Sequence, residues 1–396
     1  LTPISINGTT ISTTDLIRQK WLDNDFYVGT FSVNYDSNQT QAVFGGSYST
    51  YDGAHFGNLI WAQYSSNAAP NHRFYESDAD KKEFNLYAKA TQCLGTAWTV
   101  YADVQFRTIA YNSLGTVKGP EPIAIDNNLS FFNPKAGITY RASEASRLYL
   151  SYAKAQREPN RSDYENGTPK PESLNDFEAG WRFKKEKVQL QANLYYMDYE
   201  NQLVLTGALD AVGEPIRTNS GDSYRFGLEI EAAIQFAEQW VWQPNLALSS
   251  NKNKDFYFKR DGQLQNLGTT NISYSPNVVG ASNLVFAPST VFRVALLSKY
   301  VGEQFMGNID ADLSKLEAYF TNDINISYVW TPNSWIKEAQ FSLLVNNIFN
   351  ALYTSNGYFY TFDDDYSVAG VVTTIEGVGY YPQAGTNFLM GATFRF

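Results

Sequence analysis

The chain has very little of the chemistry on which many proteins depend. Its 396 residues include one cysteine, Cys93, and two histidines, so the sequence excludes a disulfide framework and a cysteine-based metal site. No apolar run approaches the ~18 residues that a membrane-spanning helix needs. The net charge of −10 argues against nucleic acid as a partner. No secretory leader is visible at the start of the chain.

Aromatic residues are plentiful, with 28 Tyr, 26 Phe and 8 Trp, and the carboxy-terminus shows how they are used. In the last ten residues one apolar face alternates with a mixed one; the apolar set is Phe388, Met390, Ala392, Phe394 and Phe396. This pattern is typical of the final strand of a transmembrane β-barrel, which pairs with other strands and faces lipid. The mean hydropathy of −0.35 fits this class, because a barrel strand is apolar on one side only.

The same period-2 alternation recurs in several windows, including 84–90, 98–106, 188–194 and 226–236. In the last window we expect Leu228, Ile230 and Ala232 to face lipid, with Glu229 and Glu231 on the opposite face. Alternation alone would also fit a large soluble β-sandwich, propeller or β-helix.

The lengths of the connections favour the membrane barrel. Short turns are predicted near 36–40, 95–96, 143–145, 185–186, 237–238, 287–289 and 331–337. Long connections are predicted near 51–80, 112–127, 157–171, 208–217, 252–278, 305–313 and 356–383. Alternating short and long connections are typical of outer-membrane barrels. A propeller repeat of roughly 40 residues is not found.

The sequence predicts about fifteen strands, an odd number, whereas single-chain bacterial barrels have an even number. They are expected near 26–35, 41–50, 81–94, 97–111, 128–142, 146–156, 172–184, 187–206, 217–236, 239–251, 279–286, 290–304, 315–330, 338–354 and 384–396. We therefore expect residues 1–25 to be an outer loop segment and 26–396 to be part of a larger barrel. In such a fragment the strands near 26–35 and 384–396 would be two edges that do not pair with each other.

An ordered series of motifs narrows the class. It comprises the segments 132–140, 148–159, 171–180, 194–204, 227–231, 345–353 and 381–385, followed by the terminal Phe-Arg-Phe. In this order the series resembles the barrel of TonB-dependent outer-membrane receptors, over roughly residues 20–396.

The resemblance implies an antiparallel barrel of about 22 strands whose lumen is blocked by a globular plug. It also implies uptake of a scarce ligand, such as an iron–siderophore, driven by the TonB–ExbB–ExbD complex acting on the plug. This sequence contains no plug, no TonB box and no first seven strands, so energy-coupling residues cannot be named in it.

Two loops are candidates for ligand contact. One contains His55 and His72, which could touch a metal chelate or could pack structurally. The other contains Tyr358, Tyr360, Asp363, Asp364 and Asp365. It could bind a cationic or aromatic ligand, or could be solvated surface under lipopolysaccharide, bridged by divalent ions.

Charges on the predicted polar faces form a third set: Lys89, Asp103, Arg107, Arg225, Glu229 and Glu231. They could be salt-bridged filler in a narrow barrel or could contact a plug in a wide one, and paired signs on adjacent strands favour the plug. Cys93 is interpreted as an inert small side chain.

No catalytic constellation, metal site or cofactor motif is found in the sequence, so we expect a transporter and not an enzyme. The leading hypothesis is active uptake of a metal chelate across the bacterial outer membrane. The alternatives are glycan or peptide uptake with a surface lipoprotein, a structural barrel in a larger complex, and a passive porin.

Overall fold

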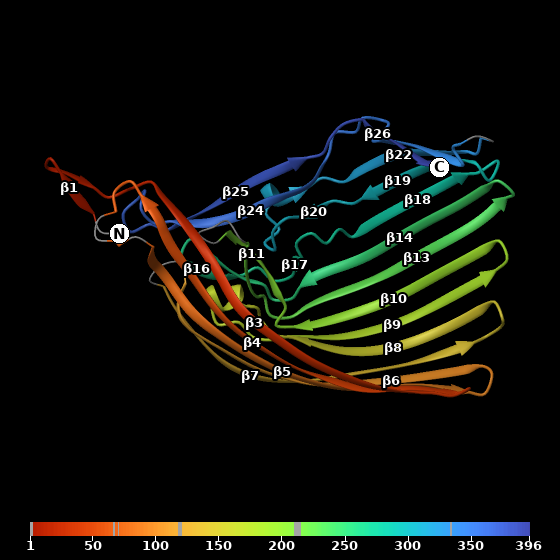
Figure 1. Ribbon diagram of the computed structural model, residues 1–396, viewed down its shortest axis with the longest axis horizontal. Helices are drawn as coiled ribbons and strands as arrows, with labels where there is room; N and C mark the ends of the chain where they lie inside the picture. Colours follow the sequence, from red (N-terminus) through yellow and green to blue (C-terminus); the bar gives the residue numbers. More distant parts are fainter. Residues whose placement is uncertain (1–2, 66–67, 70, 118–120, 210–214, 333–334) are drawn as a thin grey trace. The chain divides into compact units, whose positions relative to one another are not determined.

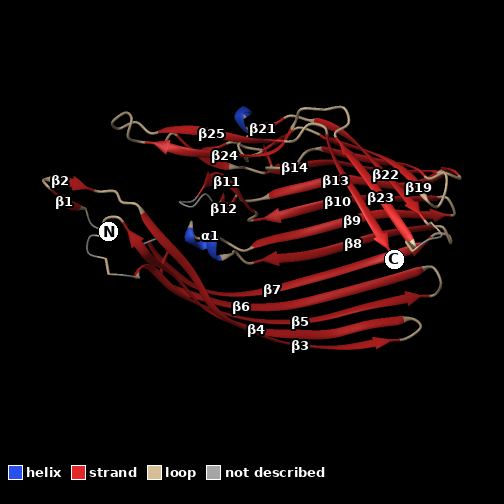
Figure 2. Cartoon of the chain, turned by 45° about the horizontal axis from the view of Figure 1, so that its top comes forward, coloured by secondary structure: helices blue, strands red, loops and turns tan. Residues whose placement is uncertain are grey.

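The computed structural model describes residues 3–65, 68–69, 71–117, 121–209, 215–332 and 335–396. These residues are almost entirely strand, and the helical segments among them are α1 (Arg161–Glu165) and the 3-10 helix η1 (Asp312–Ser314) (Figure 2). No helix in the described ranges is long and apolar enough to cross a membrane. The chain divides into two compact units, residues 1–92, 102–134 and 158–169, and residues 93–101, 135–157 and 170–396.

The first unit is built from long strands. They are β3 (Leu16–Asp36), β4 (Thr40–Ala62) and β5 (His72–Leu94), with most of β6 (Trp98–Val117) and β7 (Glu121–Arg141), and a small hairpin of β1 (Ile4–Ile6) and β2 (Thr9–Ile11) precedes them. A strand needs about 9–11 residues to cross a membrane. Strands of this length therefore extend well beyond the hydrocarbon layer.

The second unit contains shorter strands. They are β8 (Ser146–Arg157), β9 (Glu172–Lys185), β10 (Val188–Glu200), β13 (Ser223–Ala237), β14 (Trp240–Asn253), β18 (Val278–Phe286), β19 (Phe292–Val301), β22 (Tyr319–Trp330), β23 (Glu338–Asn346) and β26 (Asn387–Arg395).

The long connections of this unit contain small paired strands (Figure 1). They are β11 (Leu203–Leu209) with β12 (Pro215–Asn219), β15 (Tyr257–Arg260) with β16 (Gln263–Asn266), β20 (Gln304–Phe305) with β21 (Lys315–Leu316), and β24 (Thr354–Asp364) with β25 (Thr373–Pro382), while β17 (Thr270–Asn271) pairs with β14.

Within the described residues, the main sheet has 16 strands, and all except β17 follow one another in chain order from β3 to β26. The fifteen predicted strands are therefore all present. Because the pairs are antiparallel and sequential, the short turns fall at one end of the strands and the long connections at the other. As predicted, β3 and β26 are the two ends of this order, and no pairing between them is found among the described residues.

The register separates the two faces as the sequence predicts. Along β10 and β13, Leu194 lies opposite Leu228 and Ala192 lies opposite Ile230, whereas Asn193 lies opposite Glu229. Since neighbours along a strand point to opposite sides, Glu229 and Glu231 share one face and Leu228, Ile230 and Ala232 the other. Below, these are the polar face and the apolar face.

Aromatic pairs gather at the short-turn ends of the strands. The rings of Trp98 and Tyr140 lie 4.4 Å apart, and those of Trp240 and Phe286 lie 4.6 Å apart. An aromatic girdle at a membrane boundary is typical of outer-membrane barrels.

Two predicted long connections are wrong in extent. Residues 51–62 and 72–80 belong to β4 and β5, and their pairing continues to Leu59 and His72 with one bulge, for example Asp52 with Asp80 and Ala54 with Asp78. Strand also replaces most of 112–127, except for residues 118–120, which lie outside the described residues. Strand β3 begins at Leu16, inside the segment predicted as an outer loop. Backbone pairing beyond the membrane needs no lipid-facing alternation, so these extensions carry no period-2 signal.

Candidate functional site

A cavity of about 310 Å³ opens on the polar face of β9, β10, β13 and β14. Its charged and polar lining includes Glu178, Asn193, Tyr195, Arg225, Glu229 and Ser249. The cavity brings together Arg225 and Glu229, which the sequence selected, and adds Glu178, which sequence reasoning missed. The signal for Glu178 was available, because it stands on the strand next to β10 in a Phe-Glu-Ala-Gly motif.

Two glycines shape this wall. A Cβ at Gly180 would lie 2.2 Å from the ring of Tyr149, and a Cβ at Gly227 would lie 2.5 Å from the hydroxyl oxygen of Tyr195. Glycine therefore lets each tyrosine lie across the neighbouring strand. The Tyr149 hydroxyl donates a hydrogen bond of 2.8 Å to Asn193 Oδ1, which fixes the ring beside the cavity.

Among the described residues the carboxylates of this wall form no close ion pair, although Arg225 lines the same cavity and the charge of Arg182 acts on Glu178. In the described part of the chain, neither Glu178 nor Glu229 takes part in an ion pair within 4.0 Å, and Arg225 donates to Ser275 Oγ at 3.0 Å. Glu231 lies on the same face, opposite Gln191. Carboxylates in a confined site are stabilised by a cation or hydrogen-bond donors. The wall is thus suited to binding a cationic surface.

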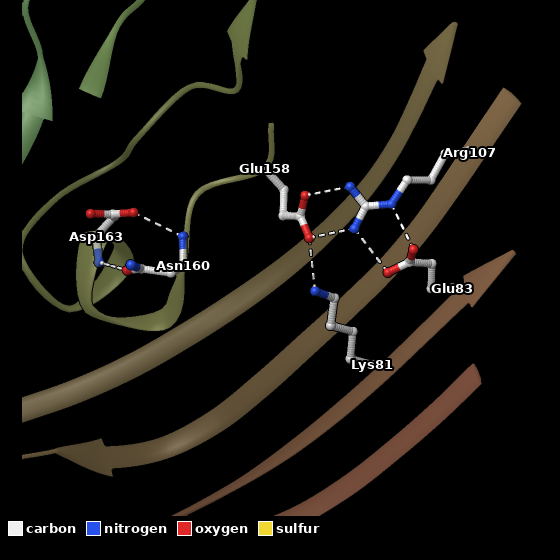
Figure 3. Close-up of polar contacts among 6 residues, drawn as sticks. All are labelled: Lys81, Glu83, Arg107, Glu158, Asn160 and Asp163. Carbon is white, nitrogen blue, oxygen red and sulfur yellow. Dashed lines mark hydrogen bonds and ion pairs between the residues drawn. The ribbon is translucent and has the colours of Figure 1, made fainter. Parts of the chain in front are cut away.

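A second polar cluster lies in the first unit and centres on Arg107 of β6 (Figure 3). Its guanidinium donates to Glu83 from Nε at 2.7 Å and to Glu158 from Nη1 at 2.8 Å and Nη2 at 2.7 Å. Lys81 Nζ adds a bond of 2.9 Å to Glu158. Arg107 was predicted to face the lumen or the plug, and its guanidinium forms ion pairs with two carboxylates of this chain.

Glu158 begins the segment that carries α1, just beyond the end of β8. Burial would raise the pKa of its carboxyl, but hydrogen bonds from Arg107 and Lys81 outweigh burial and hold that pKa at about 2. Asn160 caps α1 in a reciprocal capping box with Asp163. Arg161 then donates to Ser77 Oγ at 2.7 Å and Ser113 Oγ at 3.2 Å, so the segment is fixed to β5 and β6.

The hairpin of β24 and β25 carries an aromatic stripe, formed by Tyr358, Tyr360, Phe362 and Tyr381. The ring of Tyr358 stacks 6.2 Å from Tyr360 and lies 5.9 Å from Tyr381, and Phe362 stacks 6.4 Å from Tyr360. The opposite face of β24 is buried, with Phe359 packed against Met306 and Leu316. A Cβ at Gly379 would lie 2.3 Å from Tyr358, so this glycine allows the ring to lie across β25.

The neighbouring acids have structural partners. Asp363 Oδ1 accepts a hydrogen bond from Thr374 Oγ1 at 2.9 Å. Asp364 accepts from the backbone N–H of Ser367, and hydrogen bonds from Ser367 lower the pKa of its carboxyl. Asp365 is exposed. The predicted ligand loop is therefore a hairpin in which Asp363 and Asp364 accept hydrogen bonds from the hairpin itself, while Tyr358 and Phe362 are exposed.

The two histidines do not come together. They were predicted to share a loop, but His55 lies within β4 and His72 begins β5, with His55 opposite Ser77 and His72 opposite Leu59. Tyr51 Oη lies 3.0 Å from His55 Nε2. Among the described residues no group of three or more His, Cys, Asp or Glu is arranged to hold a metal ion. Within the same residues, Lys89 and Asp103 form no ion pair.

A sheet of sequential antiparallel strands, with one apolar face, one polar face and an aromatic girdle, is the wall of a transmembrane β-barrel of the bacterial outer membrane. The family model described as "TonB dependent receptor-like, beta-barrel" matches residues 3–348, so the chain belongs to the TonB-dependent receptor family.

The catecholate siderophore receptor Fiu of Escherichia coli K12 is 22% identical over 302 residues, which are 71% of this chain and 35% of that receptor. The crystal structure of Fiu in its closed form gives a TM-score of 0.66 at 16% identity, covering 94% of this chain and 55% of that chain. The siderophore receptor PiuA from Acinetobacter baumannii gives 0.67 at 15%, covering 95% and 56%. The chain thus spans about a third of the curated relative and just over half of each solved structure.

Proposed function

We propose that this chain is part of the barrel of a receptor that takes up a metal chelate, such as an iron–siderophore, across the outer membrane. The relatives named above, a catecholate siderophore receptor among them, support this class of cargo. Uptake would be driven by the TonB–ExbB–ExbD complex acting on a plug, and the outer surface would contact lipopolysaccharide.

The observation that carries this proposal is one cavity of the polar face in which Glu178 and Glu229 form no ion pair within 4.0 Å among the described residues, with Arg225 in the same lining. In a barrel the polar face lines the lumen. Two carboxylates and one arginine there give the cavity an excess of negative charge, which is suited to a cationic surface inside the barrel that a plug would supply. Glu231 would extend the same contact.

The aromatic stripe would take part in ligand capture. Exposed stacked rings offer a flat, weakly polar surface that suits the ligand shell of an aromatic metal chelate. His55 is a weaker candidate for ligand contact, because its Nε2 is hydrogen-bonded to the hydroxyl of Tyr51. Burial, followed by the charge of Arg161, lowers the pKa of its imidazole.

The test is uptake of radioactive iron by cells that express the full-length receptor and lack other iron receptors. Ferric dihydroxybenzoate, a catecholate complex, is the first probe. We expect saturable uptake that is abolished by deletion of TonB and by a protonophore. Uptake that persists without TonB would contradict the proposal and favour a passive channel.

A Glu178→Gln, Glu229→Gln double variant separates the plug contact from ligand binding. We expect the probe to bind cells with unchanged affinity, whereas the uptake rate changes. The matched control is Glu238→Gln, an exposed carboxylate in a short turn.

A further inference from the structure

Two hairpins that belong to different outer connections are joined at their ends. β15 and β16 form a hairpin that turns at Asp261 and Gly262, with φ of 52° and 76°. Both residue types accept this left-handed backbone. The turn lies against β25 of the second hairpin.

The join is reciprocal. The backbone N–H of Asp261 donates to Thr374 Oγ1 at 2.7 Å, and the backbone N–H of Thr374 donates to Asp261 Oδ1 at 2.8 Å. The Thr374 hydroxyl in turn donates to Asp363 of β24. One threonine therefore links the tip of the first hairpin to both strands of the second.

Ion pairs and an apolar contact reinforce the join. Arg260 Nη2 lies 2.7 Å from Glu376 Oε1, and Lys259 Nζ lies 3.4 Å from Asp363 Oδ2. A Cβ built on Gly262 would lie 3.6 Å from the Cβ of Val372. The contacts come from four consecutive residues, 259–262, so rotation about a single bond does not release the turn.

The second hairpin has a further anchor at its other end. The Tyr274 hydroxyl donates to the Gly357 carbonyl at 2.7 Å, and the Tyr380 hydroxyl donates to the Leu313 carbonyl at 2.8 Å. Tyr274 belongs to the same connection as β15 and β16. The aromatic stripe is thus held between two attachment points, both of which involve the connection between β14 and β18.

We propose that the β15–β16 and β24–β25 hairpins move as one body during transport, with Asp261 as the positioning residue that fixes the aromatic stripe. The role given to the stripe rests on the proposed function, whereas the coupling of the hairpins does not. The expected consequence is that ligand reaches a preformed surface, and that the two connections do not separate to admit it.

A cross-link tests the coupling directly. Gly262→Cys with Val372→Cys, in a Cys93→Ser background, places two Cβ atoms at the spacing of a disulfide. We expect the two thiols of the full-length receptor to oxidise in intact cells, both without chelate and with ferric dihydroxybenzoate. Uptake of that complex should be the same before and after reduction.

Two results would overturn the proposal: thiols that stay reduced, or oxidised receptor that loses uptake and regains it on reduction. If the wild-type receptor takes up no probe while the cross-link still forms, the proposed function fails and the coupling stands.

Cysteine at position 262 is strained by the positive φ, so a second measurement is independent of it. Asp261→Gly keeps the turn and removes the side-chain oxygen that accepts the hydrogen bond from Thr374 N–H. Asp261→Asn keeps both the turn and an acceptor oxygen. We expect Asp261→Gly to speed amide hydrogen exchange in β24 and β25 about tenfold and to raise the half-saturating concentration of ferric dihydroxybenzoate. Asp261→Asn and the exposed control Gln265→Ala should change neither, and unchanged exchange in Asp261→Gly would refute the join.

Discussion

The carboxylate of Glu158 accepts hydrogen bonds from both terminal nitrogens of Arg107, at 2.8 and 2.7 Å, although the two residues are 51 positions apart in the chain. The side chains are only 17% and 20% exposed. This two-point contact fixes the start of the α1 segment to the polar face of β6. Bidentate arginine–carboxylate pairs are directional, so the segment has one defined position.

Removing Arg107 should release that segment. We expect Arg107→Gln to destabilise the barrel by about 1–3 kcal/mol, because Glu83 and Glu158 each lose a charged donor. Thermal unfolding of the purified receptor measures the loss, and limited proteolysis should find new cleavage between 158 and 169. Arg141→Gln, at an exposed strand end, is the matched control and should behave as wild type.

Acid should weaken the same contact. The folded pKa of Glu158, about 2, lies below the ordinary value of 4.5, so its contribution to stability is complete above pH ~4.5. As pH falls from there toward 2, the unfolded state takes up a proton more readily than the folded state, and the contribution is lost. Pulse proteolysis from pH 6 to pH 2 should follow this loss, and Glu158→Gln should flatten the profile over that window.

Much of the wall could be predicted from sequence because lipid imposes a strict period. The alternation at 98–106 and 226–236 reports which face meets hydrocarbon, and the register of Leu228 and Glu229 agrees with it. The extensions of β4 and β5 over residues 51–62 and 72–80 could not be predicted. Residues 51–57 contain Asp, Gly and His, which indicate a turn, yet they pair with 75–81 through the backbone.

The sites were harder to predict than the wall. Tyr358 and Tyr360 could be selected from the sequence because their segment is rich in aromatic residues. The stacking of their rings, however, depends on Gly379 and Gly377, which lie opposite them in the hairpin. The partner of Arg107 depends on where the α1 segment folds, and no local pattern encodes a contact of that sequence separation. Glu178 could be selected as a site residue only after β9 and β10 had been placed side by side.

The apolar face should tolerate charge poorly. We expect Ile230→Arg, near the middle of β13, to destabilise the barrel by about 2–4 kcal/mol, because a charged arginine that faces hydrocarbon loses its hydration. Glu231→Arg, one residue along on the polar face, should cost far less. Urea unfolding in lipid vesicles compares the two, and equal losses would mean that this face does not contact lipid.

The hairpin of β24 and β25 should be reachable from outside the cell, whereas the turn at 143–145 should not. In a Cys93→Ser background, cysteine placed at Val368, which is 58% exposed, should react with an impermeant biotin–maleimide on intact cells. Cysteine at Glu144 should react only after the outer membrane is opened. Labelling of Glu144→Cys on intact cells would reverse the orientation of the whole sheet.

The aromatic stripe should determine affinity more than rate. Tyr358 lies between Tyr360 and Tyr381, so Tyr358→Ala removes a ring from the middle of the stack. An aromatic contact contributes about 0.5–1.5 kcal/mol, which predicts a half-saturating concentration of ferric dihydroxybenzoate that is about 2 to 13 times higher. The maximal uptake rate should change little, because the polar-face carboxylates are untouched. Tyr366→Ala is the control, since that ring is 76% exposed beyond the end of β24 and outside the stack. A fall in maximal rate at constant affinity would place the stripe in a later step of transport than capture.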